Sequence, residues 1–409
     1  MIPSFRQRYR PLYFLAALGA GGLSVSFFMY LMFLVPHPDA PIPTFTDLAR
    51  QYATGGMLST ALLTATLLTI TYFAVRHVRL LIAALRAHRR FTRGLGHEQL
   101  RTTNAEVSLM AIPLTLAMTV NVAFIVAALA IPGLWSVKEY LFPLALLALA
   151  AIGVLAVRTF GRYVTRTLAH RGYDLEDANH FSQLLPAFAF TMIAVGFSSA
   201  AAMSSTRTTA VIGMLGAFAF LVMAAAWITI ALPIGVSAML RQGVASEAAP
   251  TLWMGIPIFT LVGIALIRVT SGIAHTILHV QVPAIVWFVV FGLLVTAQLA
   301  MGLAGWAVMR GQGYFQTYVR GDGASVASYG LICPGVALSV LSMFFIHWGL
   351  VQTQIVARLS PAHLALLALV GVVQFVTIRT LRRLDAKLMG SPAPAAVSAP
   401  ARVAEAELV

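Results

Sequence analysis

The chain alternates between long apolar blocks and short polar connections. Ten apolar blocks occur, at residues 11–35, 56–83, 107–131, 140–160, 183–204, 208–239, 251–272, 283–309, 326–350 and 361–381. A helix needs about 20 apolar residues to cross the hydrocarbon core of a bilayer, where every backbone polar group has to be paired within the protein. The pattern therefore predicts an all-α integral membrane protein with ten transmembrane helices. We expect a single domain over residues 1–388 and a disordered Ala/Pro-rich tail over residues 389–409.

Composition and charge agree with a surface that is covered by lipid. Hydrophobic residues make up 59% of the 409 residues and charged residues only 10%, whereas a soluble chain is about 25% charged. The net charge of +14 does not indicate nucleic acid binding, because the basic residues lie in short loops between apolar blocks. Cys333 is the only cysteine, which excludes a disulfide framework and a thiolate metal cluster.

The lysines and arginines predict the orientation of the chain. Of these 27 residues, twenty-two lie in the N-terminal segment, the even-numbered loops and the C-terminal segment. The odd-numbered loops carry one each, namely Arg50, Lys138, Arg207, Arg268 and Arg358. Because basic loops stay in the cytoplasm, both termini are expected to be cytoplasmic. The first block is too long for the h-region of a signal peptide, and we interpret it as an uncleaved helix.

Four odd-numbered blocks carry a proline near the end that is expected to be cytoplasmic. The segments read AIPLTLAMTV, LLPAFAFTMI, GIPIFTLVGI and ICPGVALSVL, with spacings of 73, 71 and 77 residues between Pro113, Pro186, Pro257 and Pro334. Each spacing equals one helical hairpin, which favours an internal repeat. We therefore expect five helical hairpins in quasi-fivefold symmetry around a central pore, with the odd helices lining it. The alternative is chance, because proline is common in membrane helices.

Acidic side chains are missing from the centres of the blocks. Glu106 lies at the start of the third block and Arg158 at the end of the fourth, both close to the membrane interface. A proton- or sodium-coupled carrier usually binds its driving ion on a carboxylate at depth, so the sequence favours a passive channel or uniporter. A neutral site of hydroxyls and carbonyls could still hold sodium, which keeps a coupled carrier as the alternative.

No segment indicates an enzyme, a metal site or a cofactor. His275 and His279 have the spacing of a metal-binding pair, but no Glu follows the first as in HExxH, and an interfacial pair is the simpler interpretation. GFSSA at 196–200 and GVSAM at 235–239 are similar to a serine nucleophile turn. No His partner can be placed beside them, so we interpret both as small-residue packing motifs.

The repeat also predicts which side chains face the pore. Starting one residue before each proline and continuing at helical spacing, the predicted lining is Ile112, Leu116, Thr119, Leu185, Ala189, Met192, Ile256, Thr260, Gly263, Cys333, Ala337 and Val340. This face is apolar, with hydroxyl groups only on Thr119 and Thr260. A narrow apolar pore gates by dewetting or by a plug, while basic mouths raise the local anion concentration. The alternative is ordinary helix packing, where small residues also gather.

The ninth block resembles a known transporter family. Its segment YGLICPG, from Tyr329 to Gly335, is similar to the aromatic-x-x-x-Phe-Pro/Gly pattern of the tellurite-resistance/dicarboxylate transporter family, which includes bacterial TehA and the plant guard-cell slow anion channels. EVSLMAIPLTLAM (106–118) resembles the third helix of this family and FSQLLPAFAFTMIAVGFSSA (181–200) the fifth. The resemblance implies a homotrimer in the bacterial inner membrane, with one pore per subunit. It also implies the passage of chloride, nitrate, sulfite, malate-like dicarboxylates or tellurite.

One position departs from the family pattern. The gate of the family is the Phe before Pro/Gly in the ninth helix, and this chain has Cys333 there, or Leu331 if the alignment is shifted. Without that ring the constriction should be wider, unless Phe190, Phe259 or Met192 takes over as the gate. The alternative is that Cys333 is only a small apolar residue of a packed helix.

These observations lead us to expect an anion channel or uniporter whose partners are small anions and the lipid bilayer. One alternative is an ion-coupled exporter or importer of small organic or sulfur-containing anions on the same scaffold. A further alternative is a non-transporting membrane enzyme or assembly factor, which would have a closed and packed axis.

Overall fold

The computed structural model describes residues 5, 9–169 and 172–390. Within these residues, ten helices are long and apolar enough to cross a membrane, and they match the ten predicted blocks. The secondary structure of the described residues is helical apart from a single antiparallel β-bridge between Phe5 and Met389. The fold class predicted from the hydrophobic pattern is therefore confirmed. The predicted tail, 389–409, lies outside the described residues beyond Gly390.

Each odd-numbered span consists of a short 3₁₀-helix followed by an α-helix. The α-helices are α1 (Phe14–Leu34), α5 (Ala111–Ala130), α7 (Leu185–Met203), α9 (Gly255–Gly272) and α11 (Ile332–Phe344). The 3₁₀-helices before them are η1 (Pro11–Tyr13), η2 (Asn104–Met110), η5 (Phe181–Leu184), η6 (Ser246–Trp253) and η9 (Val326–Leu331). Two of the α-helices, α9 and α11, continue into the π-helices η7 (Ile273–Leu278) and η10 (Phe345–Val351).

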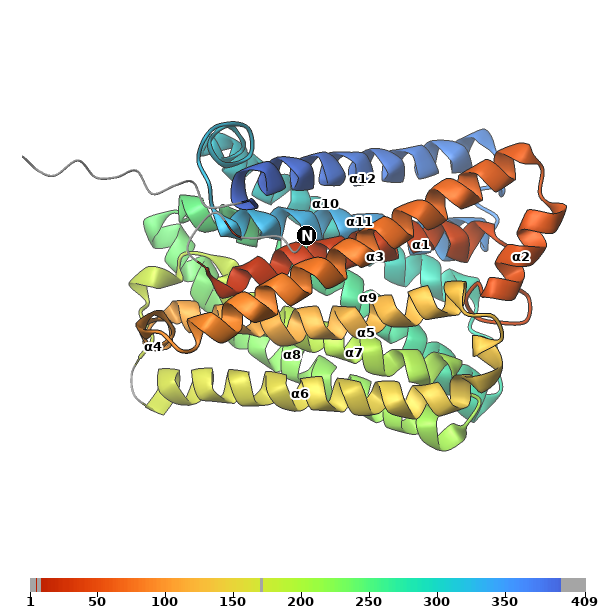
Figure 1. Ribbon diagram of the computed structural model, residues 1–409, viewed down its shortest axis with the longest axis horizontal. Coiled ribbons are helices and arrows are strands. Elements are labelled where there is room, and N and C mark those ends of the chain that lie inside the picture. The colour runs from red at the N-terminus through yellow and green to blue at the C-terminus, as the bar shows by residue number, and fades with distance from the viewer. Residues whose placement is uncertain (1–4, 6–8, 170–171, 391–409) are drawn as a thin grey trace, which may run out of the picture.

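The even-numbered spans contain longer α-helices. They are α3 (Met57–Phe91), α6 (Lys138–Ala169), α8 (Arg207–Gln242), α10 (Ala284–Gly311) and α12 (Pro361–Leu388). Two short helices lie in loops at opposite ends of the bundle, α2 (Phe45–Thr54) and α4 (Leu95–Leu100) (Figure 1). We call these ends the α2 end and the α4 end. The odd helices begin at the α4 end. The connections between the spans also contain three further short helices, η3 (Leu134–Val137), η4 (Glu176–Ala178) and η8 (Phe315–Arg320).

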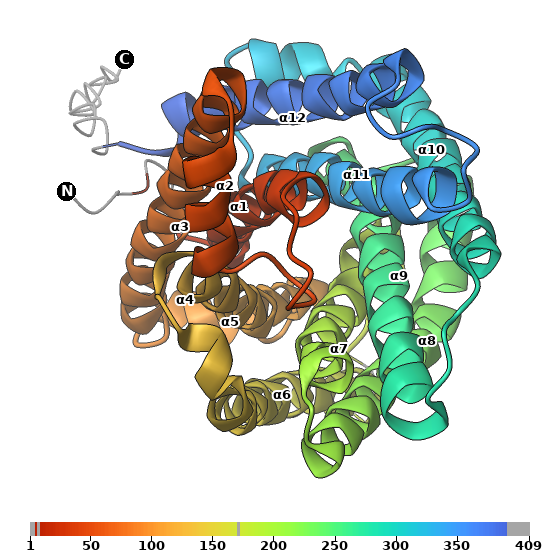
Figure 2. The same ribbon diagram turned by 90° about the vertical axis from the view of Figure 1, so that its right-hand side faces the viewer.

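The fold consists of five hairpins with the odd helices inside and the even helices outside. Each odd helix packs against the even helix that follows it, and the odd helices close a ring in the order α1, α5, α7, α9, α11 and back to α1. Figure 2 shows this ring end-on. In the most apolar part of each span, 44–94% of the residues are buried in the odd spans but only 22–28% in the even spans. The even helices therefore present apolar faces to lipid, and the quasi-fivefold arrangement is the predicted one.

The repeated prolines occupy one structural position. Pro113, Pro186, Pro257 and Pro334 fall within the first three residues of their α-helices, directly after a 3₁₀-helix. The first turn of an α-helix has unpaired N–H groups, so proline removes no hydrogen bond there and fixes the backbone for the turn. These prolines thus start the helices of the ring and do not bend them in the middle. The first span follows the same plan with Pro11 in its 3₁₀-helix.

Polar side chains of the outer helices bind the inner helices within the membrane. Gln298 on α10 donates through Nε2 to the carbonyl oxygen of Ile256 (2.7 Å) and to Thr260 Oγ1 (2.6 Å) on α9. Gln374 on α12 donates to Ser26 Oγ on α1 over 3.0 Å. Leaving such a buried group unpaired would cost about 1–3 kcal/mol. These bonds therefore fix how each outer helix sits against the ring.

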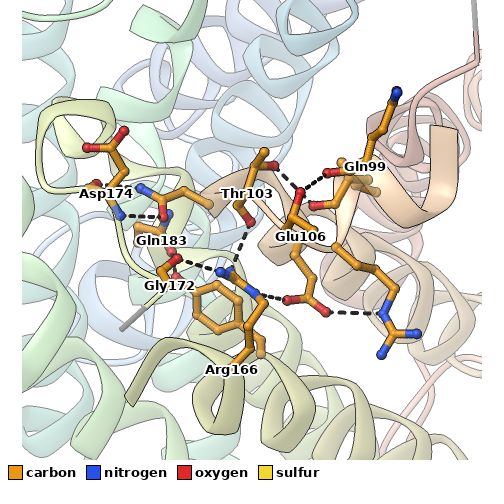
Figure 3. A network of polar contacts seen from close by, with 12 residues as sticks. Gln99, Thr103, Glu106, Arg166, Gly172, Asp174 and Gln183 are labelled. Carbon is orange, nitrogen blue, oxygen red and sulfur yellow. Dashed lines mark hydrogen bonds and ion pairs between the residues drawn. The ribbon is translucent and has the colours of Figure 1, made fainter. Parts of the chain in front are cut away.

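An ion-pair network ties α6 to the start of the third span at the α4 end (Figure 3). Arg166 donates through Nε to Glu106 Oε2 over 2.7 Å, and through its two Nη atoms to the carbonyl oxygens of Gly172 and Thr103. Arg101 lies 3.6 Å from the other carboxylate oxygen of Glu106. The Glu106 side chain is only 4% exposed, so two arginines compensate a buried negative charge.

Glycine permits a close contact between α9 and α7. A Cβ atom on Gly272 would overlap the backbone carbonyl of Ala201. Since backbone atoms cannot move aside as a flexible side chain can, we expect Gly272→Ala to lower the free energy of unfolding by about 2 kcal/mol. Thermal unfolding in detergent measures this loss. Gly302→Ala on α10 is the matched control, because its Cβ would meet only Ile256 Cδ1 at 3.8 Å, and an equal loss in both variants would contradict the packing interpretation.

Candidate functional site

Two cavities lie along the axis of the helix ring. The larger, of about 70 Å³, is lined by all five odd helices, through Leu18, Gly19, Gly22, Val25, Met118, Phe188, Met192, Pro257, Thr260, Leu261, Ile264, Cys333, Val336, Ala337 and Val340. The smaller, of about 40 Å³, is lined by the 3₁₀-helices and first helical turns of the first, fifth, seventh and ninth spans, through Leu12, Leu15, Ser182, Leu185, Phe188, Pro250, Thr251, Met254, Pro257, Ala327, Gly330, Cys333 and Pro334. The smaller cavity therefore lies at the α4 end and the larger one deeper in the membrane-spanning part.

Phe188, Pro257 and Cys333 line both cavities and therefore lie between them. We call these three residues the constriction. Phe188 is 3% exposed and Cys333 is 7% exposed. In the described part of the chain, Phe188 carries the one aromatic ring of either lining. The benzyl group of Phe188 thus separates two largely apolar cavities.

The larger cavity presents no free hydroxyl group to an ion. Its one hydroxyl belongs to Thr260, which donates to the carbonyl oxygen of Ala337 over 2.9 Å and accepts from Gln298 Nε2. The hydroxyl proton of Thr260 is therefore used within the protein. A cavity of this size has the volume of about two water molecules, but an apolar cavity stays dry. Dry apolar segments are barriers to ions, so this part of the axis is closed to ions in the conformation described.

The structure brings six of the twelve predicted pore residues to an axial cavity, namely Leu185, Met192, Thr260, Cys333, Ala337 and Val340. It places the other six outside both linings, namely Ile112, Leu116, Thr119, Ala189, Ile256 and Gly263. On α5, Met118 reaches the cavity, whereas Thr119 Oγ1 lies 2.9 Å from His77 Nε2 of the outer helix α3. On α9, a Cβ atom on Gly263 would point at Leu294 of α10.

Of the five residues predicted for the gate, only Cys333 lies at the constriction, and Met192 lines the larger cavity but not the smaller one. Phe190 points away from the axis, because its ring packs edge-on against Phe160 of the outer helix α6 with 5.3 Å between centroids. Leu331 belongs to a separate apolar cluster beside α10 and η8. Phe259 lines neither cavity.

Phe188 is the residue between the cavities that the predicted lining misses. The predicted face continues from Leu185 by four residues to Ala189, whereas the structure continues it by three residues to Phe188. Both steps are compatible with one face of a helix. Phe188 is also four residues before Met192, which lines the same cavity. The signal in the sequence is therefore a bulky ring at helical spacing among small and medium side chains.

Arg268 lies inside α9, four residues before the helix ends, and not in the seventh loop to which the sequence assigns it. Its Nη1 donates to the carbonyl oxygen of Val195 over 3.0 Å and to Ser199 Oγ over 2.7 Å, both on α7. The ring of odd helices thus contains a charged side chain within a membrane span. Because such side chains are costly and usually functional, Arg268 belongs to the candidate site.

The sequence matches no known protein-family profile and no curated protein. The resemblance to the tellurite-resistance/dicarboxylate transporter family therefore rests on the motifs quoted above. Five hairpins around an axis are what that resemblance implies for the fold.

Proposed function

We propose that this chain is a channel or uniporter that passes small anions along the axis of its helix ring. The observation that carries the proposal is the pair of axial cavities, which the odd helices enclose and the constriction separates. A path of this kind is closed by a side chain and opens when that side chain moves. A non-transporting protein, the further alternative, would have side chains filling its axis.

Positive charge supports the choice of anions as the substrate. The formal net charge is +14. Basic residues gather at the α4 end, among them Arg86, Arg89, Arg90 and Arg93 at and after the end of α3. Such a mouth raises the local concentration of anions and lowers that of cations. The anions that the family resemblance suggests are chloride, nitrate, sulfite, malate-like dicarboxylates and tellurite.

The placement of the buried carboxylates supports passive transport. Asp47 accepts hydrogen bonds from Thr44 in the cap of α2, and Glu106 pairs with Arg166 at the α4 end. No carboxylate of the described residues lines either axial cavity. A coupled carrier usually binds its driving ion on a carboxylate at depth. That alternative predicts a reversal potential that shifts with an imposed proton or sodium gradient.

The proposal includes a location and an assembly. With the α4 end in the cytoplasm, the positive-inside rule is satisfied in a bacterial inner membrane and both termini lie inside. The family resemblance favours a homotrimer with one path in each subunit. Such a trimer would bury part of the apolar faces that the even helices expose.

Flux of chloride and nitrate into proteoliposomes tests the proposed function. We expect a selective anion flux that a small thiol reagent blocks, because Cys333 is the only cysteine and lies at the constriction. Cys333→Phe should reduce the flux by at least about tenfold, which corresponds to ~1.4 kcal/mol of barrier, because a second ring joins that of Phe188.

Cys333→Ala is the matched control for this experiment. It should keep the flux and lose the sensitivity to the reagent, because alanine leaves the constriction open to the same degree but has no thiol. Absence of flux for every small anion, together with an unreactive Cys333, would contradict the proposed function.

A further inference from the structure

Arg268 has partners of a different kind from those of Arg166. The charge of Arg166 is compensated by Glu106 at 2.7 Å. Arg268 contacts two neutral oxygens instead, the carbonyl oxygen of Val195 and Ser199 Oγ. In the part of the chain that the structure describes, no carboxylate lies within ion-pair distance of Arg268. The positive charge inside this membrane span is therefore held in place but not neutralised.

The guanidinium group of Arg268 has more N–H donors than its bonds to the described residues use. It carries five N–H groups in a planar fork. Both known bonds start from Nη1, so the N–H groups of Nη2 and Nε make no bond to the described residues. Ser199 Oγ in turn donates to the Val195 carbonyl over 3.1 Å, which orients it to accept from Arg268. One edge of the fork is thus fixed to α7, and the other edge can bind a ligand.

The helix positions place Arg268 on the axis-facing side of α9. Leu261 and Ile264 line the larger cavity, and Arg268 follows them by seven and four residues, on the same helix face. On α7, Met192 lines that cavity and Ser199 follows it by seven residues, again on the same face. Arg268 and Ser199 therefore meet roughly 6 Å beyond the cavity, towards the α2 end.

We propose that Arg268, held by Val195 and Ser199, is an anion-binding site at the α2 end of the axis. It takes small inorganic anions and binds planar oxyanions such as nitrate most tightly. A planar oxyanion accepts two parallel N–H hydrogen bonds from a guanidinium fork, one on each of two oxygen atoms. Chloride is a single spherical ion and does not match the two parallel donors in this way. This inference rests on the proposed function, because it assigns the substrate class to a site on the same path.

Thermal unfolding of the purified protein in detergent tests this site without any flux. Sodium nitrate and sodium chloride are titrated against sodium gluconate at constant ionic strength, since a ligand of the folded state raises the Tm. We expect a lower apparent Kd for nitrate than for chloride. Arg268→Gln should weaken nitrate binding by at least about tenfold. Arg207→Gln is the matched control, because Arg207 is exposed at the start of α8, at the same end of the bundle.

Arg268→Lys keeps the positive charge but lacks the planar guanidinium fork. This variant tests the anion-binding site if Arg268→Gln does not fold. It should retain chloride binding and lose the preference for nitrate. Equal nitrate binding in wild type and Arg268→Gln, or an unchanged preference in Arg268→Lys, would overturn the site. If nitrate binding depends on Arg268 but the protein passes no anion, the proposed function would be contradicted and the Arg268 site would stand. Anion flux through a protein whose Tm does not rise with nitrate would contradict the Arg268 site but not the proposed function.

Discussion

Phe188→Ala should raise the anion flux of this protein by at least about tenfold, a change of ~1.4 kcal/mol in the barrier. The Phe188 ring lies between the two axial cavities, where Pro257 and Cys333 complete the constriction. Alanine at this position would join the cavities into one wider passage, and widening an apolar constriction favours its hydration and ion passage. Chloride flux into proteoliposomes, compared at equal amounts of folded protein, measures the change.

Phe190→Ala is the matched control for this prediction. Phe188 and Phe190 lie on the same helix and are 3% and 0% exposed. Both substitutions should destabilise the protein by about 3–5 kcal/mol, because each leaves a cavity where a ring was. Only Phe188 borders the axial cavities, since Phe190 packs against Phe160 of α6. A flux that rises equally in both variants would mean that loosened packing, and not the constriction, limits transport.

Glu106→Gln should lower the free energy of unfolding by about 3 kcal/mol, the largest effect on stability that we expect from a polar substitution. The side chains of Glu106 and Arg166 are 4% and 17% exposed, so water compensates little for the loss of the carboxylate charge. Arg166 would keep its bonds to backbone carbonyls but lose the negative charge beside it. Thermal unfolding in detergent at neutral pH measures the difference.

Asp39→Asn is the matched control for the buried ion pair. Asp39 and Arg50 lie 3.6 Å apart with 81% and 49% of their side chains exposed. An exposed pair of this kind contributes about 0–1 kcal/mol, so the Tm should change little. If Glu106→Gln shifted the Tm as little as Asp39→Asn, the network at the α4 end would not stabilise the fold as we infer.

The hydrophobic pattern predicts most of the fold because a membrane helix has to be apolar along its length. The ten blocks mark the ten spans for this reason, and the proline repeat separates odd helices from even ones. The weak point of the repeat is the first span, whose helix lacks the proline. There the signal is glycine: a Cβ atom on Gly19 would lie 2.8 Å from Ile332 of α11, and one on Gly22 would lie 2.9 Å from Val336. These contacts place α1 in the ring and against the cavity.

The residues that face the axis were only partly predictable. Adjacent residues of a helix differ by about 100° in direction, so the choice between Phe188 and Ala189 decides whether a ring points at the axis or away from it. Spacing from Leu185 permits both, and only packing against neighbouring helices selects one. Arg268 was missed for a related reason. Its neutral partners lie on α7, far earlier in the chain, and hydropathy alone assigns an arginine near the end of a block to a loop.

The conductance of the double variant Phe188→Ala/Cys333→Phe in planar lipid bilayers tests most directly whether the axis is the anion path. Both side chains belong to the same constriction, although they come from α7 and α11. We predict that Phe188→Ala alone raises the anion conductance and that the ring added at position 333 cancels most of this gain. A conductance that Cys333→Phe leaves unchanged in the Phe188→Ala background would place the anion path elsewhere in the protein.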